Sequence, residues 1–171
     1  TMKDCGNTAV GDHCYFMACS HVAHDCQIGD HVIMANGTML GGHCRVQDFA
    51  SISGAVAVHH FVTIGSYAFV GGMSRVLQDV PPFMLNEGQP AKPRCVNLVA
   101  LKRNEFPQDV IKALTEAHRL LFRARVGLEH AREILRSESK LLPQVVQLLE
   151  FIEQQQEGRF GRARQIRRKA A

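Results

Sequence analysis

A large apolar residue recurs at every sixth position through the first half of the chain, and this period restricts the fold more than any other feature. The column comprises Val10, Phe16, Val22, Ile28, Met34, Leu40, Val46, Ile52, Val58, Ile64, Val70 and Val76. A second column, four residues after each of these positions, holds only small or β-branched residues, from Cys14 to Val80. An amphipathic helix repeats every 3.6 residues and a half-buried strand every two, so neither explains a period of six.

A strict hexapeptide repeat is typical of a parallel β-helix, in which each hexad supplies one short strand and one corner. Three hexads close one triangular coil in the left-handed form, so residues 10–81 predict four coils. The large column is expected to fill the interior. The small column, with Cys14, Cys26 and Cys44, is expected to be core filling rather than a metal site. The repeat ends at Pro81-Pro82, because proline donates no ladder hydrogen bond.

The rest of the chain predicts a different structure. Residues 83–104 are rich in proline and glycine and favour an extended connection. Three short apolar stripes follow, starting near Pro107, Leu128 and Pro143, and they predict three helices that must pack together. The expected fold class is β + α. A left-handed parallel β-helix spans residues 1–82, and a small C-terminal helical domain with a basic tail spans residues 105–171.

The charge of the chain is concentrated at its C-terminus. Twenty Lys and Arg against 16 Asp and Glu give a formal net charge of +4. Six of the basic residues stand at or after Arg159, where we expect a solvated, frayed tail, with a basic binding arm as the alternative. The body is therefore not a basic nucleic-acid-binding domain. No apolar run approaches the roughly 20 residues of a membrane-spanning helix. The six cysteines form no CxxC pair, which favours reduced thiols in a cytoplasmic protein.

Histidines gather in the repeat region at spacings that the coil turns into geometry. His24, Gly42 and His60 are spaced three hexads apart, so they are predicted to share a column on three successive coils. The two imidazoles then lie about 10 Å apart with a glycine between them. Asp25 follows His24 and is suited to orient its imidazole. A neutral imidazole near pH 7 removes a proton from an alcohol in general base catalysis.

A second stack consists of His13 and His31. It is predicted to end at Phe49, to have no accompanying acid or glycine, and therefore to be an exposed surface feature without a catalytic role.

Several segments resemble the UDP-N-acetylglucosamine O-acyltransferases of lipid A biosynthesis, a hexapeptide-repeat acyltransferase family. They read SHVAHDC at 20–26, LGGH at 40–43, AVHHF at 57–61, VGG at 70–72, QDVPP at 78–82 and LKR at 101–103. The resemblance covers nearly the whole chain. It implies transfer of an (R)-3-hydroxyacyl group from acyl carrier protein to the 3-hydroxyl of UDP-N-acetylglucosamine, the first step of lipid A biosynthesis. It also implies a cytoplasmic homotrimer with no metal or other cofactor, the phosphopantetheine thioester of the carrier protein being the donor.

The resemblance assigns roles to individual residues. His24 matches the general base, Asp25 its orienting partner, and Gly42 the backbone N–H donor to the thioester oxyanion. Substrate contacts are implied for His21, His43, His59, Asn97 and Arg103, the last two toward the nucleotide. His60 is also expected to bind substrate, although relatives carry glutamine there.

The sequence departs from the family at three further positions. Asn104 stands where some relatives carry a second arginine, Val99 replaces an acidic nucleotide contact, and Pro90 occupies a position linked to acyl-chain length. The chain-length preference therefore stays open. The resemblance also implies further coils before residue 1, so we expect an N-terminally truncated member. A basic helical surface for the acidic carrier protein is expected from Lys102, Arg103, Lys112, Arg119, Arg123 and Arg125.

Two other functions fit the same scaffold. One is a zinc enzyme similar to the γ-class carbonic anhydrases, with His21, His24 and His43 as ligands. The other is a non-catalytic β-helix that only mediates assembly.

Overall fold

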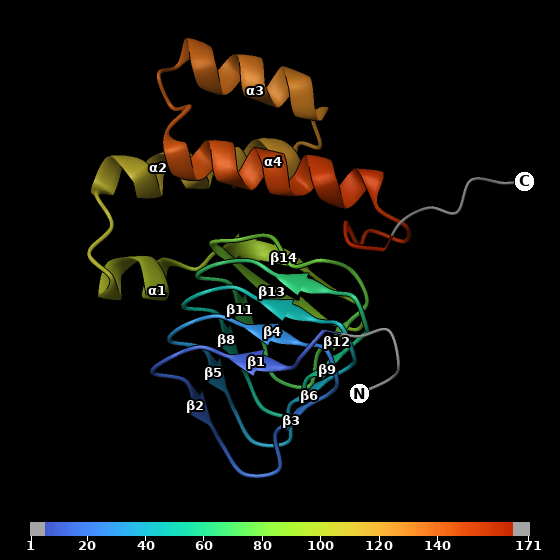
Figure 1. Ribbon diagram of the computed structural model, residues 1–171. Coiled ribbons are helices and arrows are strands. Elements are labelled where there is room, and N and C mark those ends of the chain that lie inside the picture. Colours follow the sequence, from blue (N-terminus) through green and yellow to red (C-terminus); the bar gives the residue numbers. More distant parts are fainter. Residues whose placement is uncertain (1–5, 166–171) are drawn as a thin grey trace, which may run out of the picture.

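A computed structural model describes residues 6–165 of the chain, and its first half is a triangular parallel β-solenoid (Figure 1). Its strands have two residues each. They are β1 (Ala9–Val10), β2 (Tyr15–Phe16), β3 (His21–Val22), β4 (Gln27–Ile28), β5 (Ile33–Met34), β6 (Met39–Leu40), β7 (Arg45–Val46), β8 (Ser51–Ile52), β9 (Ala57–Val58), β10 (Thr63–Ile64), β11 (Phe69–Val70) and β12 (Arg75–Val76).

Every third strand belongs to the same sheet. The first sheet contains β1, β4, β7 and β10, the second β2, β5, β8 and β11, and the third β3, β6, β9 and β12. Paired strands are parallel and three hexads apart in the sequence, as in Ala9 opposite Gln27. The predicted β-helix, with three hexads in each coil, is therefore confirmed.

The core of the solenoid contains both predicted columns from Cys26 onward, whereas at the first coil Val10 and Phe16 are 48% and 37% exposed and Cys14 is only partly buried. Met34, Ile64 and Val70 of the large column have no exposed surface, and neither do Cys26 and Cys44 of the small column. The Sγ atoms of these two cysteines donate to the carbonyls of Gly41 and His59 at 3.2 Å. The buried thiols are thus packed and hydrogen-bonded within the core, as the sequence predicts.

Each corner between strands consists of two residues, and the second adopts the left-handed conformation. The residues with positive φ at the corners are His13, Cys19, Asp25, His31, Gly37, His43, Phe49, Ala55, Phe61, Tyr67 and Met73. Only one of these is a glycine, although a left-handed φ costs other residues roughly 1 kcal/mol. The corner N–H groups bond to the adjacent coil, as His43 N–H does to the carbonyl of His24 at 3.0 Å. These bonds offset the backbone strain.

Two of the three corner columns carry imidazole and aromatic rings. The His24 corner links the third sheet to the first and contains residues 24–25, 42–43, 60–61 and 78–79. The His31 corner links the first sheet to the second and contains residues 12–13, 30–31, 48–49 and 66–67. The predicted end of the His31 stack at Phe49 is wrong, because the Phe49 ring stacks in turn on Tyr67 at 4.8 Å.

Much of the connection at residues 83–104 is extended, as expected, but its strand pairing and its final helix were not predicted. It contains the antiparallel hairpin of β13 (Met84–Gly88) and β14 (Ala91–Val96), followed by helix α1 (Leu98–Arg103). β13 pairs with β11 and so extends the second sheet beyond the hexad repeat. The hairpin forms because Met84 and Val96 on it are buried under the helices.

The three predicted helices are present. They are α2 (Gln108–His118), which continues as a π-helix over Arg119–Arg123, α3 (Leu128–Ser137) and α4 (Pro143–Glu157). Figure 1 shows them above the end of the solenoid that carries β13 and β14. Their apolar faces share one core with Phe83, Met84 and Val96 of the preceding segment. No described helix has the length and apolar character to span a membrane.

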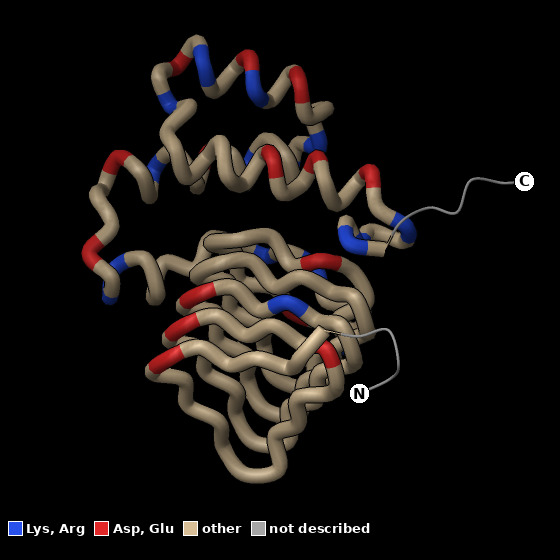
Figure 2. The backbone as a smooth tube through the Cα atoms, viewed as in Figure 1, with Lys and Arg blue, Asp and Glu red and all other residues tan. Residues whose placement is uncertain are grey.

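The predicted frayed tail is wrong for residues 159–165. Arg162 is only 5% exposed, and this segment is hydrogen-bonded to the solenoid. Figure 2 shows basic residues of this segment beside the solenoid, near the end of α4. Arg167, Arg168 and Lys169 lie outside the described residues.

Candidate active site

A histidine–carboxylate pair occupies the His24 corner. His24 Nδ1 lies 2.6 Å from Asp25 Oδ2, and the Asp25 side chain is 5% exposed whereas that of His24 is 42% exposed. A buried carboxylate on Nδ1 fixes the orientation of the ring and favours the tautomer with a basic Nε2. The structure therefore brings together the two residues that the sequence predicted as base and orienting partner.

Gly42, on the next coil, packs directly against the His24 imidazole. A Cβ atom on residue 42 would come within 2.5 Å of His24 Nε2 and 2.6 Å of its Cε1. Glycine is required here for close packing and not for a left-handed φ, since Gly42 is absent from the residues with positive φ. The neighbouring N–H groups of Gly41 and His43 bond to the carbonyls of Val58 and His24.

His43 completes the cluster from the next coil. Its ring meets that of His24 edge to face at 5.0 Å, and its Nε2 lies 3.9 Å from Asp25 Oδ2. On its other side His43 stacks on the Phe61 ring at 4.6 Å. The imidazole is therefore positioned by an acid on one side and an aromatic ring on the other.

His59 and His60 lie on the coil above. Their rings are 3.8 Å apart, and His59 Nδ1 lies 3.1 Å from the carbonyl oxygen of His60. Partial burial lowers the pKa of His60, and the nearby positive groups His59, Arg162 and His43 lower it further. His60 is therefore biased toward its neutral form near pH 7.

A metal-capable cluster exists among the described residues, but it differs from the set suggested for a zinc enzyme. The donor atoms of His24, Asp25 and His43 all lie within 4.8 Å of one another, and His21, on strand β3, is outside this group. The short contact between His24 Nδ1 and Asp25 already commits one nitrogen and one carboxylate oxygen to each other. This geometry favours an imidazole that is oriented by the Asp25 carboxylate over one that serves as a metal ligand.

Asn97 and Arg103 lie away from the His24 corner, on another side of the solenoid. They line a groove of about 450 Å³ with residues of the second sheet, including Ile33 and Phe69. Asn97 also caps helix α1, since its Oδ1 accepts from Ala100 N–H at 3.2 Å and its Nδ2 donates to the Tyr67 carbonyl at 2.8 Å. In a triangular solenoid the second sheet is opposite the His24 corner. One chain therefore does not bring these two predicted nucleotide contacts to His24.

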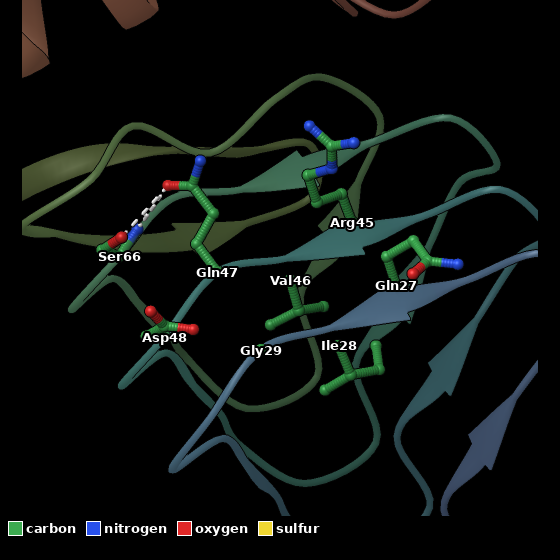
Figure 3. A pocket seen from close by; sticks show the side chains of 8 residues that line it. All are labelled: Gln27, Ile28, Gly29, Arg45, Val46, Gln47, Asp48 and Ser66. Carbon is green, nitrogen blue, oxygen red and sulfur yellow. Dashed lines mark hydrogen bonds between the residues drawn. The ribbon is translucent and has the colours of Figure 1, made fainter. Parts of the chain in front are cut away.

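A second, shallow pocket of about 340 Å³ lies on the outer face of the first sheet (Figure 3). Much of its polar lining is engaged in internal hydrogen bonds. Gln47 Oε1 accepts from the N–H and hydroxyl of Ser66, and Gln27 Nε2 donates to the Asn7 carbonyl at 2.6 Å. Arg45 contributes a positive charge beside the His24 corner.

Two contacts at this corner were not predicted from the sequence. Arg164 Nη1 donates to the carbonyl of His43 at 2.6 Å, and Asp79 holds the C-terminal segment at the top of the column. Asp79 stands one full coil after Phe61, so the repeat predicts that it lies at the same corner on the next coil. No signal in the sequence places Arg164 there.

Comparison with known proteins gives consistent matches. Residues 79–160 match the family described as UDP-N-acetylglucosamine O-acyltransferase, domain 2, and residues 7–42 match the bacterial transferase hexapeptide family. The acyl-[acyl-carrier-protein]–UDP-N-acetylglucosamine O-acyltransferase of Burkholderia orbicola is 38% identical over 162 residues, which are 92% of this chain and 62% of that protein. The chain thus spans about 62% of the length of such curated relatives.

Solved structures agree. The UDP-N-acetylglucosamine acyltransferase from Arabidopsis is 40% identical with a TM-score of 0.78, over 84% of this chain and 52% of that one. The Acinetobacter baumannii protein LpxA is 32% identical with a TM-score of 0.79, over 93% and 59%. The solenoid, the helical layer and these matches together show that the chain belongs to the UDP-N-acetylglucosamine O-acyltransferase family.

Proposed function

We propose that the protein transfers an (R)-3-hydroxyacyl group from acyl carrier protein to the 3-hydroxyl of UDP-N-acetylglucosamine, with His24 as general base. The observation that carries the proposal is the 2.6 Å contact of His24 Nδ1 with buried Asp25, in a chain of this family. The contact leaves Nε2 to take a proton. The reaction would be the first step of lipid A biosynthesis, in the cytoplasm.

The proton and electron pairs balance within this site. His24 Nε2 takes the proton of the sugar hydroxyl while the hydroxyl oxygen attacks the thioester carbonyl. The Asp25 carboxylate stabilises the imidazolium that forms. The C–S bond then breaks, and the imidazolium returns the proton to the phosphopantetheine thiolate. No redox partner is required.

The N–H of Gly42 is the proposed donor to the oxyanion of the tetrahedral intermediate. It stands between two N–H groups that are bonded to neighbouring carbonyls. It also belongs to the residue against which the His24 ring packs. A single such donor contributes roughly 3 kcal/mol of barrier reduction in acyl transfer.

The separation of the two predicted site regions supports a shared active site. Asn97 and Arg103 face a groove over the second sheet, whereas His24 stands at the opposite corner. We therefore propose a homotrimer in which the groove of one copy faces the His24 corner of the next. UDP-N-acetylglucosamine would contact His21, His43, His59 and His60 from one copy and Arg103 from another.

The carrier protein is proposed to dock on the helical layer. Lys102, Arg103, Lys112, Arg123 and Arg125 are exposed and suited to an acidic partner. Arg119 contributes less, because Glu116 accepts two hydrogen bonds from its guanidinium.

One assay tests the proposal. Full-length protein is incubated with UDP-N-acetylglucosamine and a set of 3-hydroxyacyl carrier proteins of different chain lengths, and products are identified by mass spectrometry. We expect an O-acylated sugar nucleotide whose formation is insensitive to a chelator. Absence of product with every donor contradicts the proposal, and one zinc per site with chelator-sensitive turnover supports the zinc enzyme instead.

A further inference from the structure

The C-terminal segment at residues 159–165, here called the strap, folds back onto the solenoid at the His24 corner. It follows helix α4 and turns back on itself, with Arg159 N–H donating to the Gln165 carbonyl at 2.9 Å. Arg162 Nε donates to the Gln165 side chain at 2.7 Å within the same turn. The strap therefore has a defined conformation of its own.

Asp79 anchors the strap to the fourth level of the corner column. Its carboxylate accepts from the N–H of Ala163 and from the N–H of Thr63, both at 2.7 Å. Its own N–H donates to the Gly161 carbonyl at 2.8 Å. Arg162 Nη1 adds a bond to the Leu77 carbonyl at 2.7 Å. The strap is thus tied to the solenoid through both its backbone and a side chain.

From this anchor the strap extends one more side chain toward the candidate site. Arg164 is partly buried, and its Nη1 donates to the carbonyl of His43 at 2.6 Å. A charged donor makes this a strong hydrogen bond. Burial lowers the pKa of Arg164, and the nearby cation Arg45 lowers it further. The guanidinium thus lies close to another cation while it donates to a backbone carbonyl.

The carbonyl that Arg164 binds belongs to the residue that packs against the base. The His43 ring meets the His24 ring at 5.0 Å, and its Nε2 is 3.9 Å from Asp25 Oδ2. His43 has a left-handed φ of 60°, so its backbone at this corner is strained and its ring direction depends on that conformation. A hydrogen bond to its carbonyl fixes the peptide plane on the C-terminal side of this residue.

We propose that Arg164 is a positioning residue of the acyl transfer site: it holds the His43 backbone so that the His43 ring packs against the His24–Asp25 pair. Through the strap, the C-terminal part of the chain contributes to the His24 corner. The inference rests on the proposed function only because the kinetic test uses acyl transfer as its readout. The positioning itself can be measured without turnover.

The first test is a double-mutant cycle in the full-length protein. We expect Arg164→Ala to lower kcat about tenfold with little change in KM for UDP-N-acetylglucosamine, because a misplaced catalytic group affects the chemical step. In a His43→Ala background the same substitution should have no further effect, since the ring it positions is gone. The matched control is Arg159→Ala, which removes another strap arginine whose guanidinium lies 4.7 Å from the Phe160 ring centroid.

The second test does not need turnover. Diethyl pyrocarbonate labels neutral histidines, and peptide mass spectrometry gives the rate for each ring. We expect Arg164→Ala to raise the labelling rate of His43 several-fold while His31, on the other corner, stays unchanged. If that variant does not fold, Arg164→Lys is used, with a smaller rise expected.

The outcomes separate the two proposals. Unchanged His43 labelling in a folded Arg164 variant overturns the positioning role, whatever the enzyme does. An equal loss of kcat in the wild-type and His43→Ala backgrounds also overturns it, because Arg164 would then act independently of His43. A full-length protein that forms no product, but whose His43 labelling responds to Arg164, refutes the proposed reaction and keeps the positioning role.

Discussion

The His24 corner and the His31 corner have the same backbone and different side-chain patterns. Both place a left-handed residue at the second corner position on successive coils. In the His31 corner the rings stack without interruption: His13 on His31 at 4.9 Å, His31 on Phe49 at 4.6 Å, and Phe49 on Tyr67 at 4.8 Å.

The residues before these rings repeat as well. Asp30 Oδ1 accepts from the N–H of Asp12 at 2.7 Å, and Asp48 Oδ1 accepts from the N–H of Asp30 at 2.9 Å. The same carboxylates occupy the space where Gly11 and Gly29 lack a side chain. Figure 2 shows the acidic residues stacked along this edge of the solenoid. Each repeated level of the His31 corner therefore has the same structural role, which is to bond one coil to the next.

No two levels of the His24 corner are alike. From the first level to the fourth the pairs are His24–Asp25, Gly42–His43, His60–Phe61 and Gln78–Asp79. A backbone that tolerates one repeated ladder does not need this variety for its stability. The comparison indicates that the regular His31 corner serves to stabilise the coil, and it agrees with the proposal that the His24 corner is the site of the chemistry.

The largest effect should come from removing the proposed base. We expect His24→Ala in the full-length protein to lower kcat about a thousandfold, within the usual contribution of general base catalysis. His31→Ala is the matched control, because it removes an exposed imidazole from the other corner. Steady-state kinetics at saturating UDP-N-acetylglucosamine measure both. Equal activity of the two variants contradicts the assignment of chemistry to the His24 corner.

The second effect tests the packing of the ring on glycine. Gly42→Ala places a methyl group against the His24 imidazole, and we expect kcat to fall about thirtyfold as the ring is displaced. The matched control is Gly54→Ala, because the atom nearest to a Cβ at residue 54 is the Asn36 carbonyl oxygen at 3.4 Å. A kcat for Gly42→Ala equal to that of the control is the result that argues against tight packing as the reason for this glycine.

The repeat made the solenoid predictable because its period is encoded at every hexad. Counting in steps of three hexads gives each residue a place on the coil, so His24, Gly42 and His60 could be aligned from the sequence. The acid ladder of Asp12, Asp30 and Asp48 follows the same spacing, so the expectation that no acid accompanies the His31 stack was wrong. Its hydrogen bonds to the adjacent coil were not predicted, because the spacing aligns the side chains without showing where each carboxylate points.

What the repeat does not encode could not be predicted in the same way. The hairpin of β13 and β14 forms through tertiary burial of Met84 and Val96, which local composition does not reveal. The strap has the composition of a charged terminal segment, and its hydrogen bonds to Leu77, Asp79 and His43, which composition does not reveal, hold it on the solenoid. The distance between Asn97 and His24 likewise follows from which sheet each residue joins.

The third prediction concerns Asp79, the level of the His24 corner that anchors the strap. Burial raises the pKa of Asp79 to about 6, although two N–H donors and nearby arginines favour the charged form. The folded protein therefore binds this proton more tightly than the unfolded chain. The resulting stabilisation is complete below about pH 4 and is lost as the pH rises through 6.

Denaturant unfolding of wild type and Asp79→Asn at several pH values checks this. The isosteric amide does not titrate, so the difference between the two proteins isolates the carboxylate. As the pH falls from 7.5 to 4.5, we expect the free energy of unfolding of the wild type to rise by about 2 kcal/mol relative to that of the variant. A difference that is constant over this range shows that the carboxylate is not perturbed by its burial.

The smallest effect compares one ring from each corner. Phe49 stacks between His31 and Tyr67, and Phe61 stacks on His43, so each substitution to alanine removes a ring from a ladder. We expect both to cost about 1 kcal/mol of unfolding free energy, since exposed edges limit what each ring contributes. Only Phe61→Ala should also lower kcat, about threefold, because the His43 ring loses the surface on which it rests. Urea unfolding and kinetics on the same two preparations give both quantities. If Phe49→Ala reduces kcat as much as Phe61→Ala, the regular corner is not purely structural.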